Sequence, residues 1–230
     1  LANRKVSLRD MPRTDRSFVS IKSNLRTPNI DSLAVQGMRF TQCYAGSPVC
    51  APSRSVLMTG QHTGHTRVRG NTGKGGVLGL GGKPGRVPFE DSDITVAEIL
   101  KTTGYQTGMS GKWGLGEPGT TGLPNDQWFD FWFGFLISVG RTVIIRITFG
   151  SIANGFALPG NSDGRQHQYA HDQMTGFALH FVREQVATSP RSPFFLYVPY
   201  TVPHANFEVP DLGIYADKPW TDDEKAYAAM

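Results

Sequence analysis

The pentapeptide Cys50-Ala51-Pro52-Ser53-Arg54 predicts the beginning of a short helix. Pro52 suits the first helical turn, where the N–H group that proline lacks would have no partner within the helix. Val56 and Leu57 continue the helix, and Gly60 is a typical residue for ending it. The pattern therefore places a cysteine at a helix N-terminus.

Cys50 and Arg54 together suit an anionic ligand. The first N–H groups of a helix have no helical partner, and the positive end of the helix dipole favours negative charge. Arg54 follows one turn later, and its guanidinium can bind two oxygens of an oxyanion at once. Residues 39–45 read as a strand that would bring Cys50 to the carboxyl edge of an α/β sheet, where ligands commonly bind. These features predict a site for sulfate or phosphate.

The same residues resemble the Cys-x-Pro-Ser-Arg signature of type I sulfatases, an arylsulfatase-like family in which the cysteine is oxidised to formylglycine. Residues 57–60 (Leu-Met-Thr-Gly) and 27–31 (Thr-Pro-Asn-Ile-Asp) resemble the blocks on either side of this signature. The resemblance is close to continuous over 27–136 and again from about 154 to the end. It implies an alkaline-phosphatase-like α/β fold, a mixed sheet flanked by helices, of which the chain would hold the N-terminal portion only.

The composition is that of an ordinary globular protein, with 39% hydrophobic and 18% charged residues among 230. A net charge of +4 with scattered Lys and Arg argues against a nucleic-acid surface, and no apolar run is long enough to span a membrane. Cys43 and Cys50 lack metal-site spacing, and a disulfide between them stays open. Because the chain begins at Leu1 and ends at Met230 in a helix-like run, we expect a fragment, so a signal peptide stays open as well.

The N-terminal region departs from the family pattern. A sulfatase-like chain would have a buried strand there that ends in Asp-Asp-x-Gly, whose aspartates bind calcium, and residues 1–26 contain no adjacent aspartates. We therefore predict an aberrant or truncated segment at 1–26 and a partial sulfatase catalytic domain at 27–230. Within the latter, Thr27 is expected to cap a helix that begins with Pro28 and ends at Gly37.

Four further residues near the signature are candidates for substrate binding. Ser53 lies within it, and three polar residues follow at the start of a glycine-dense segment, residues 70–86, or just before it: His65, Arg69 and Asn71. The segment lacks the Gly-x-x-x-x-Gly-Lys-Ser/Thr spacing of a phosphate-binding loop. It is expected to be a surface loop near the site.

Lys112 is the strongest candidate outside the signature. A helix is expected from Ser92 or Asp93 to Gly104, followed by a strand over 105–109. The strand leads into residues 110–116, which resemble the sulfatase block Gly-Lys-Trp-His-Leu-Gly, whose lysine binds the sulfate. The resemblance thus assigns sulfate binding to Lys112, whereas Gly114 stands where many relatives have a catalytic histidine.

Residues 136–153 read better in another reading frame. Sulfatase-like chains often carry a segment similar to Arg-Ala-His-x-Tyr-Tyr-Pro-x-x-Leu-Trp after Gly-Phe-Leu. When the frame moves by two bases, residues 137–150 can be read as a peptide that contains Gln-Cys-Arg-Ala-His-Ser-Tyr-Tyr-Pro-Asp-Tyr-Leu-Trp. We therefore expect two compensating frameshifts, near 136 and near 153. The alternative is one or two buried strands, because the stretch has high β-propensity.

The last part of the chain returns to a regular pattern. Asp172 is expected to begin a helix with an apolar face, and residues 194–200 to form a short buried strand. His204 follows this strand after Pro203. The Pro-His pair resembles the sulfatase block that carries an active-site histidine, which assigns a catalytic role to His204.

The resemblance also implies a mechanism. One hydroxyl of hydrated formylglycine, made from Cys50 and bound to calcium, would attack the sulfur while Arg54 and Lys112 neutralise the sulfate oxygens. His204 would protonate the leaving alcohol. The family further implies calcium as cofactor, a sulfated small molecule or carbohydrate as substrate, a formylglycine-generating maturation enzyme as partner, and a periplasmic or secreted location for the parent protein.

Two alternatives stay open beside sulfate-ester hydrolysis. A phosphoesterase or phosphonate hydrolase of the alkaline phosphatase superfamily shares the fold and can share the cysteine motif. The chain can also be a non-catalytic partial translation product. Because the carboxylate ligands for calcium are absent from the chain, the fragment as given is expected to be inactive.

Overall fold

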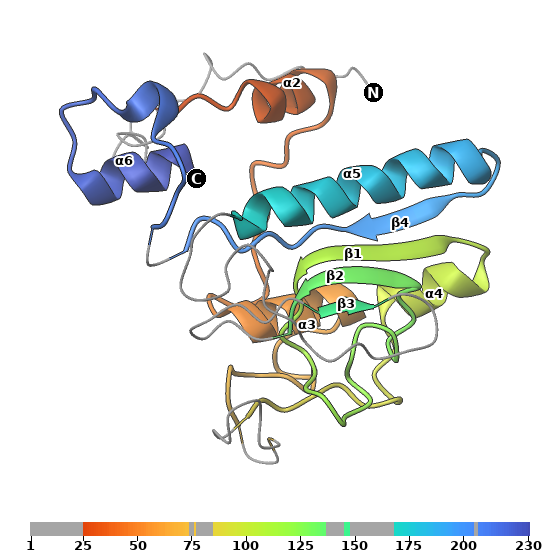
Figure 1. The fold of residues 1–230 in the computed structure, drawn as a ribbon. Coiled ribbons are helices and arrows are strands. Elements are labelled where there is room, and N and C mark those ends of the chain that lie inside the picture. The colour runs from red at the N-terminus through yellow and green to blue at the C-terminus, as the bar shows by residue number, and fades with distance from the viewer. Residues whose placement is uncertain (1–24, 74–75, 77–84, 137–144, 148–167, 205–206) are drawn as a thin grey trace. The chain divides into compact units, whose positions relative to one another are not determined.

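The computed structural model describes residues 25–73, 76, 85–136, 145–147, 168–204 and 207–230. The chain divides into two compact units, Leu1–Cys43 and Tyr44–Met230 (Figure 1). In the first unit, helix α2 (Pro28–Gln36) begins with proline at its first turn, as predicted. Thr27 stands at the N-cap position, but its hydroxyl donates to the Asp31 carboxylate at 3.2 Å and makes no capping bond to the backbone.

The strand predicted over 39–45 is absent, and the apolar residues of this region do not form a core face. The apolar side chains of α2 do not form a buried face, since no residue of the helix is buried and Leu33 is 71% exposed. Residues 39–45 form no strand, and their aromatic side chains, Phe40 and Tyr44, are exposed. An apolar sequence pattern does not by itself make a strand or a buried face, because both depend on tertiary packing.

The second unit contains a four-stranded sheet in the order β3-β2-β1-β4. Its strands are β1 (Gln106–Lys112), β2 (Phe131–Phe135), β3 (Ile145–Ile147) and β4 (Phe194–Tyr197). The central strand β1 pairs in parallel with β2 and with β4, and β3 pairs antiparallel to β2. The predicted strands at 105–109 and 194–200 are confirmed with shifted bounds. Of the suspected out-of-frame stretch 136–153, the structure describes the buried Leu136 and β3, and the rest lies outside the described residues.

Helices pack on both faces of this sheet (Figure 1): α5 (Ala170–Thr188) on one, and α3 (Cys50–Thr59) with α4 (Val96–Thr102) on the other. Small residues of β1 let α5 approach. A Cβ at Gly108 would lie 2.7 Å from the Phe181 ring, and Ser110 Oγ donates to the Met174 carbonyl at 2.7 Å. The sheet is therefore covered on both sides, as in α/β folds.

The predicted helix bounds need small corrections. α3 begins at Cys50, and Gly60 ends it in a left-handed conformation with φ of 67°, both as predicted. α4 begins after Thr95, not at Ser92 or Asp93, because Thr95 and Glu98 form a reciprocal capping box. α5 begins two residues before Asp172.

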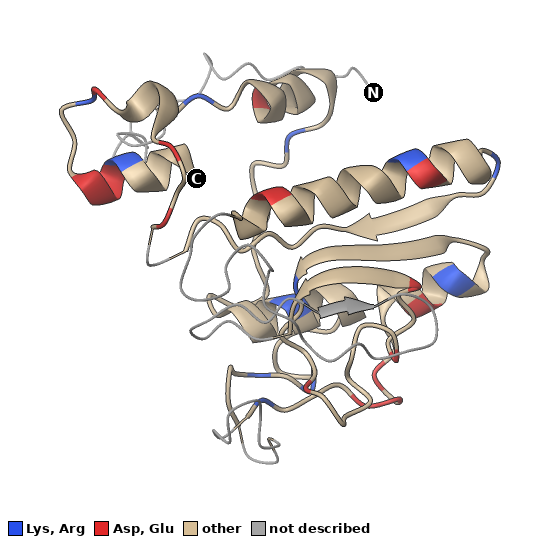
Figure 2. Cartoon of the chain, in the orientation of Figure 1, with Lys and Arg blue, Asp and Glu red and all other residues tan. Residues whose placement is uncertain are grey.

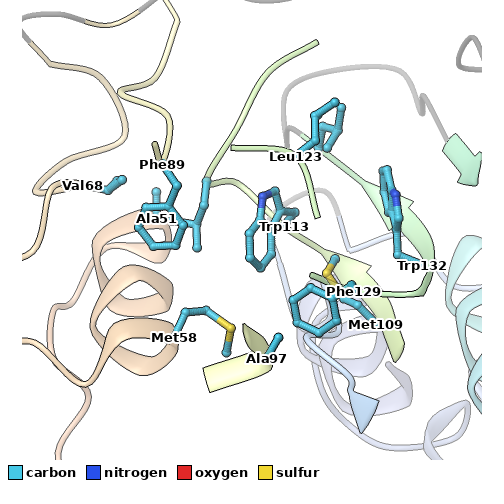
Figure 3. Packing of buried hydrophobic residues seen from close by; sticks show 12 residues of the cluster. Ala51, Met58, Val68, Phe89, Ala97, Met109, Trp113, Leu123, Phe129 and Trp132 are labelled. Carbon is cyan, nitrogen blue, oxygen red and sulfur yellow. The ribbon is translucent and has the colours of Figure 1, made fainter. Parts of the chain in front are cut away.

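The core lies between β1, α3 and α4 (Figure 3). Trp113, which directly follows Lys112, is fully buried and packs edge-on against Phe89 and Phe129 at centroid distances of 6.2 and 5.7 Å. Its indole N–H donates to the Gly122 carbonyl at 2.6 Å. Phe129 and Trp132 of the aromatic segment 126–135 are buried in this core, whereas Trp128 of the same segment is 48% exposed. The anchored Trp113 indole fixes the end of β1, from which Lys112 projects.

Two glycines let main chains meet at the end of β1. Gly111 and Gly134 are opposite each other in the β1–β2 pairing, with φ of 139° and 148°. A Cβ at Gly134 would lie 1.8 Å from the Gly111 carbonyl oxygen, and one at Gly111 would lie 2.3 Å from that of Pro199. The chain after β4 therefore closes directly onto β1, where Lys112 N donates to Pro199 O at 2.9 Å.

The C-terminal region holds a 3-10 turn, Gly213–Tyr215, and helix α6 (Asp222–Ala229). Thr221 and Glu224 form a second capping box, which confirms the helix predicted there. Among the described residues, no helix has the length and apolar character needed to cross a membrane.

Candidate active site

Cys50 begins α3 and is half-buried. Its thiol donates to Asn71 Oδ1 at 3.2 Å, and the same oxygen accepts the Ala51 N–H at 3.3 Å. Asn71 was predicted only as a candidate for lining the substrate pocket. The structure brings it to the cysteine, where its amide oxygen holds one of the otherwise unpartnered N–H groups of the helix start. Cys43 and Cys50 are both free thiols, so no disulfide joins them.

Lys112 lies beside the thiol at the end of β1. Only 3% of the residue is exposed, and Nζ donates to Cys50 Sγ at 3.5 Å. Burial of the thiol opposes its ionisation, but the positive charge of Lys112 and hydrogen bonds from Lys112 and from the Ala51 N–H outweigh burial. The pKa of Cys50 therefore lies below its ordinary value. Burial lowers the pKa of Lys112, and the charge of Arg54 lowers it further.

Arg54 is also held at the end of β1, by hydrogen bonds to main-chain carbonyls. Its Nη1 donates to the main-chain oxygens of Lys112, at 2.7 Å, and of Trp113, at 3.5 Å. Burial lowers the pKa of its guanidinium, which Tyr197 and Cys50 partly offset. Arg54 is the one charged residue in the sequence of α3, and Figure 2 shows blue and no red on this helix. The described residues provide neither Arg54 nor Lys112 with a carboxylate partner, so both cations are available to an anion.

Arg86 is a third cation near the site that the sequence did not predict. The segment 70–86 was expected to be a surface loop, yet Arg86 is only 6% exposed. Its charge contributes to lowering the pKa of both Arg54 and Lys112. The one available signal was that Arg86 is the last residue of the glycine-dense segment and directly precedes the apolar run at 87–89, where the chain enters the core.

The other predicted residues lie farther out or are engaged elsewhere. Ser53 is half-buried on α3, and its N–H donates to the Val49 carbonyl at 3.0 Å. His65 is exposed and lies edge-on to the ring of His62 at 6.3 Å. Arg69 is exposed, with Nε donating to the Thr66 carbonyl at 3.0 Å. His204 is exposed in the chain that follows β4. Their predicted roles stay predictions.

The described residues do not suit a calcium ion. Calcium prefers several oxygen ligands, carboxylates above all. Among the described residues, Asn71 Oδ1 and Lys112 Nζ contact Cys50, Arg54 interacts with it electrostatically, and Arg86 lies near Arg54 and Lys112. No group of three or more His, Cys, Asp or Glu within the described ranges could hold a metal. Positive charge dominates this site, and it favours an anion over a cation.

A cysteine at a helix N-terminus and cations that converge at the end of a parallel strand form, in this α/β protein, a candidate site for an anion. The family model described as Sulfatase matches residues 7–228, and the chain belongs to the sulfatase family. Its fold is the predicted alkaline-phosphatase-like α/β fold, with helices on both faces of a mixed sheet.

Known proteins similar to the chain are longer than it. The chain is 33% identical to the arylsulfatase of Klebsiella aerogenes over 194 residues, which covers 80% of the chain and 39% of the relative. It superposes on the crystal structure of Ps i-CgsB with a TM-score of 0.68 at 25% identity, covering 90% of the chain and 46% of that protein. BT4656, solved in complex with its substrate D-glucosamine-2-N,6-O-disulfate, gives 27% identity and a TM-score of 0.51, covering 80% and 31%. The chain thus spans less than half the length of each.

The link between Lys112 and the thiol gives a titration prediction. Lys112→Met removes the charge that lowers the pKa of Cys50 while burial remains, so that pKa is expected to rise. The pH dependence of iodoacetamide alkylation measures it, in a Cys43→Ser variant whose mass shows an unoxidised Cys50. The midpoint should move to higher pH in Lys112→Met and stay in place in Lys218→Met, an exposed lysine outside the site. An unmoved midpoint in Lys112→Met contradicts the prediction.

Proposed function

We propose that this protein hydrolyses sulfate esters, with residue 50 as the position of the nucleophile. The observation that carries the proposal is the meeting of Cys50, Lys112 and Arg54 at the start of α3 and the end of β1. Membership of the sulfatase family and the similarity to an arylsulfatase support the same reaction. The substrate's negative charge would replace the carboxylate partners that the two cations lack among the described residues.

Formylglycine fits the position of Cys50. An oxygen in place of the sulfur would lie between Asn71 Oδ1, which accepts hydrogen bonds, and Lys112 Nζ, which donates them. When present, the hydrated aldehyde supplies an oxygen nucleophile and a second hydroxyl, whose loss of a proton allows sulfate to leave. Asn71 and Lys112 would hold and orient these hydroxyl groups.

Arg54 and Lys112 supply the electrostatic part of the mechanism. Cleavage of a sulfate ester spreads negative charge over the sulfate oxygens and the leaving oxygen, and fixed cations stabilise that charge without reorganising during the reaction. The two carbonyl contacts of Arg54 and the burial of Lys112 fix both groups before substrate arrives. Partial burial strengthens their attraction for the anion because water screens it less.

His204 is proposed as the proton donor to the leaving alcohol. Imidazole titrates near neutral pH, which suits proton transfer. His204 follows β4, which pairs with β1, and Lys112 lies at the end of β1. Pro199, between β4 and His204, accepts a hydrogen bond from the Lys112 N–H. This continuity of backbone supports a place for His204 near the same edge. His65, Arg69 and Ser53 are proposed as contacts for the rest of the substrate.

The substrate class is proposed to be a sulfated small molecule or carbohydrate. The sulfated glucosamine bound by BT4656 supports a sugar. We further propose a formylglycine-generating enzyme as the maturation partner and a periplasmic or secreted location. Within the chain, we assign 27–230 to part of the catalytic domain and keep 1–26 and 136–153 as segments that depart from its pattern. Because the described residues do not fit calcium, no step is assigned to that ion.

The test compares two substrates and the mass of residue 50. The full-length protein should turn over an aryl sulfate much faster than the matching aryl phosphate, and the peptide containing residue 50 should have the mass of formylglycine. Faster turnover of the phosphate would make the protein a phosphoesterase. A plain thiol at residue 50 in protein with full sulfatase activity would contradict the proposed nucleophile.

A further inference from the structure

Arg86 combines burial with an unsatisfied donor. The residue is 6% exposed, and Nη1 is fully buried with no hydrogen-bond partner in the described part of the chain. A buried guanidinium without a partner destabilises the fold, because it loses the hydration that the unfolded chain gives it. Such a group is uncommon in proteins and calls for a physical explanation.

The unpartnered nitrogen lies next to Gly114, two residues after Lys112. A Cβ at position 114 would lie 3.3 Å from Arg86 Nη1, and Gly114 has a φ of 79°, which disfavours other residues. Glycine therefore leaves the space beside Nη1 free of any side chain from this position. That space is at the end of β1, on the same segment that carries the sulfate-binding candidate Lys112.

Arg86 also adds to a concentration of positive charge at the site. It interacts electrostatically with both Arg54 and Lys112, and the interaction is repulsive in each case. The ion pairs of the described residues join other groups, Arg67 with Glu90 and Asp93, and Lys101 with Asp130. Three cations held together in this way are stabilised by an anion that contacts all of them.

We propose that Arg86 is a third substrate-binding cation, which contacts the sulfate group of the substrate through Nη1 across the space left open at Gly114. The inference rests on the proposed function and adds a residue to its site. Arg54 approaches the anion from α3, Lys112 from β1, and Arg86 from the chain that precedes Phe89. A sulfate ester has three terminal oxygens, so each of the three cations can bind a different one.

The experiment measures binding of inorganic sulfate to the full-length protein by the rise in its thermal unfolding temperature, with sodium chloride at matched ionic strength as reference. Arg86→Met removes the charge and the donors but keeps an apolar stem. It should weaken sulfate binding by about tenfold or more, the effect of losing a charged hydrogen bond. Without sulfate, the variant should unfold at the same temperature as the parent or higher, because a buried, repelled cation has been removed.

Two comparisons make the result specific. Arg183→Met removes an exposed arginine on α5 and should leave sulfate binding unchanged. Lys112→Met should weaken it. If Arg86→Met does not fold, Arg86→Gln replaces it in the comparison. Glutamine is also neutral, but it keeps a polar end.

The outcomes separate this inference from the function on which it rests. If Lys112→Met weakens sulfate binding while a folded Arg86 variant keeps parental affinity and unfolds at a lower temperature, Arg86 is structural and the inference is overturned, although the sulfate site stands. If sulfate stabilises the parent no more than chloride does, both the inference and the sulfate site fall.

Discussion

Replacing Cys50 with alanine is expected to lower sulfate-ester hydrolysis by about a thousandfold or more, because the position of the covalent nucleophile is lost. The substitution should leave the fold intact. Alanine is a good helix former, and among the described residues it loses only the hydrogen bonds that the thiol makes with Asn71, Lys112 and the Ala51 N–H. Initial rates with an aryl sulfate at saturating concentration measure the effect, and circular dichroism checks the fold.

Cys43→Ala is the matched control for this prediction. Cys43 is an exposed free thiol in the other compact unit, so its loss should not change the rate. Parental activity in Cys50→Ala would remove residue 50 from the chemistry. A loss of equal size in both variants would point to a general effect of removing cysteine.

Gly134→Ala is expected to destabilise the fold by more than about 4 kcal/mol or to prevent folding. Few mechanisms cause a loss of this size, and a clash with the backbone is one of them. The added methyl would lie 1.8 Å from the Gly111 carbonyl oxygen, and φ of 148° is strained for alanine. Because β2 and β4 flank β1 as parallel strands, and α5 packs on both β1 and β2, the sheet cannot move aside locally. Chemical denaturation measures the loss, or soluble yield where folding fails.

Gly119→Ala isolates the clash from the backbone conformation. Gly119 also has a positive φ, 85°, but a Cβ there meets nothing within 4 Å. It should cost only about 1 to 2 kcal/mol, the strain of a left-handed residue. Equal losses in the two variants would show that the contact between β1 and β2 is less tight than the structure indicates.

The parts of the site that the sequence predicted are those with local signals. Pro52 and Gly60 mark the two ends of α3 whatever the rest of the chain does, and β1 is bounded by a glycine turn and followed by a buried tryptophan. These elements place Cys50 and Lys112. Cys50 was singled out by the helix start and by the resemblance of residues 50–54 to the sulfatase signature, and Lys112 by the resemblance of residues 110–116 to a second sulfatase block. Membership of the sulfatase family and the α/β fold were predictable from the same motifs.

Contacts between residues that are far apart in the sequence could not be predicted from it. Asn71 lies 21 positions from Cys50, and nothing local shows that its amide turns to the thiol. Arg86 has the residue type expected of a surface loop, and only tertiary packing buries it. The strand expected at 39–45 failed for the converse reason, since alternating apolar residues form a strand only where a neighbouring strand pairs with them.

The packing of α3 also decides when Cys50 can be modified. Ala51, Pro52 and Ser55 are buried, with Ala51 1% and Ser55 0% exposed, and the hydroxyl of Ser55 is bonded to that of Thr66. An enzyme that recognises the pentapeptide would have to bind side chains that are buried in the folded protein. If Cys50 is oxidised as proposed, the enzyme would have to act before this helix packs, and a chain that folds first would keep its thiol.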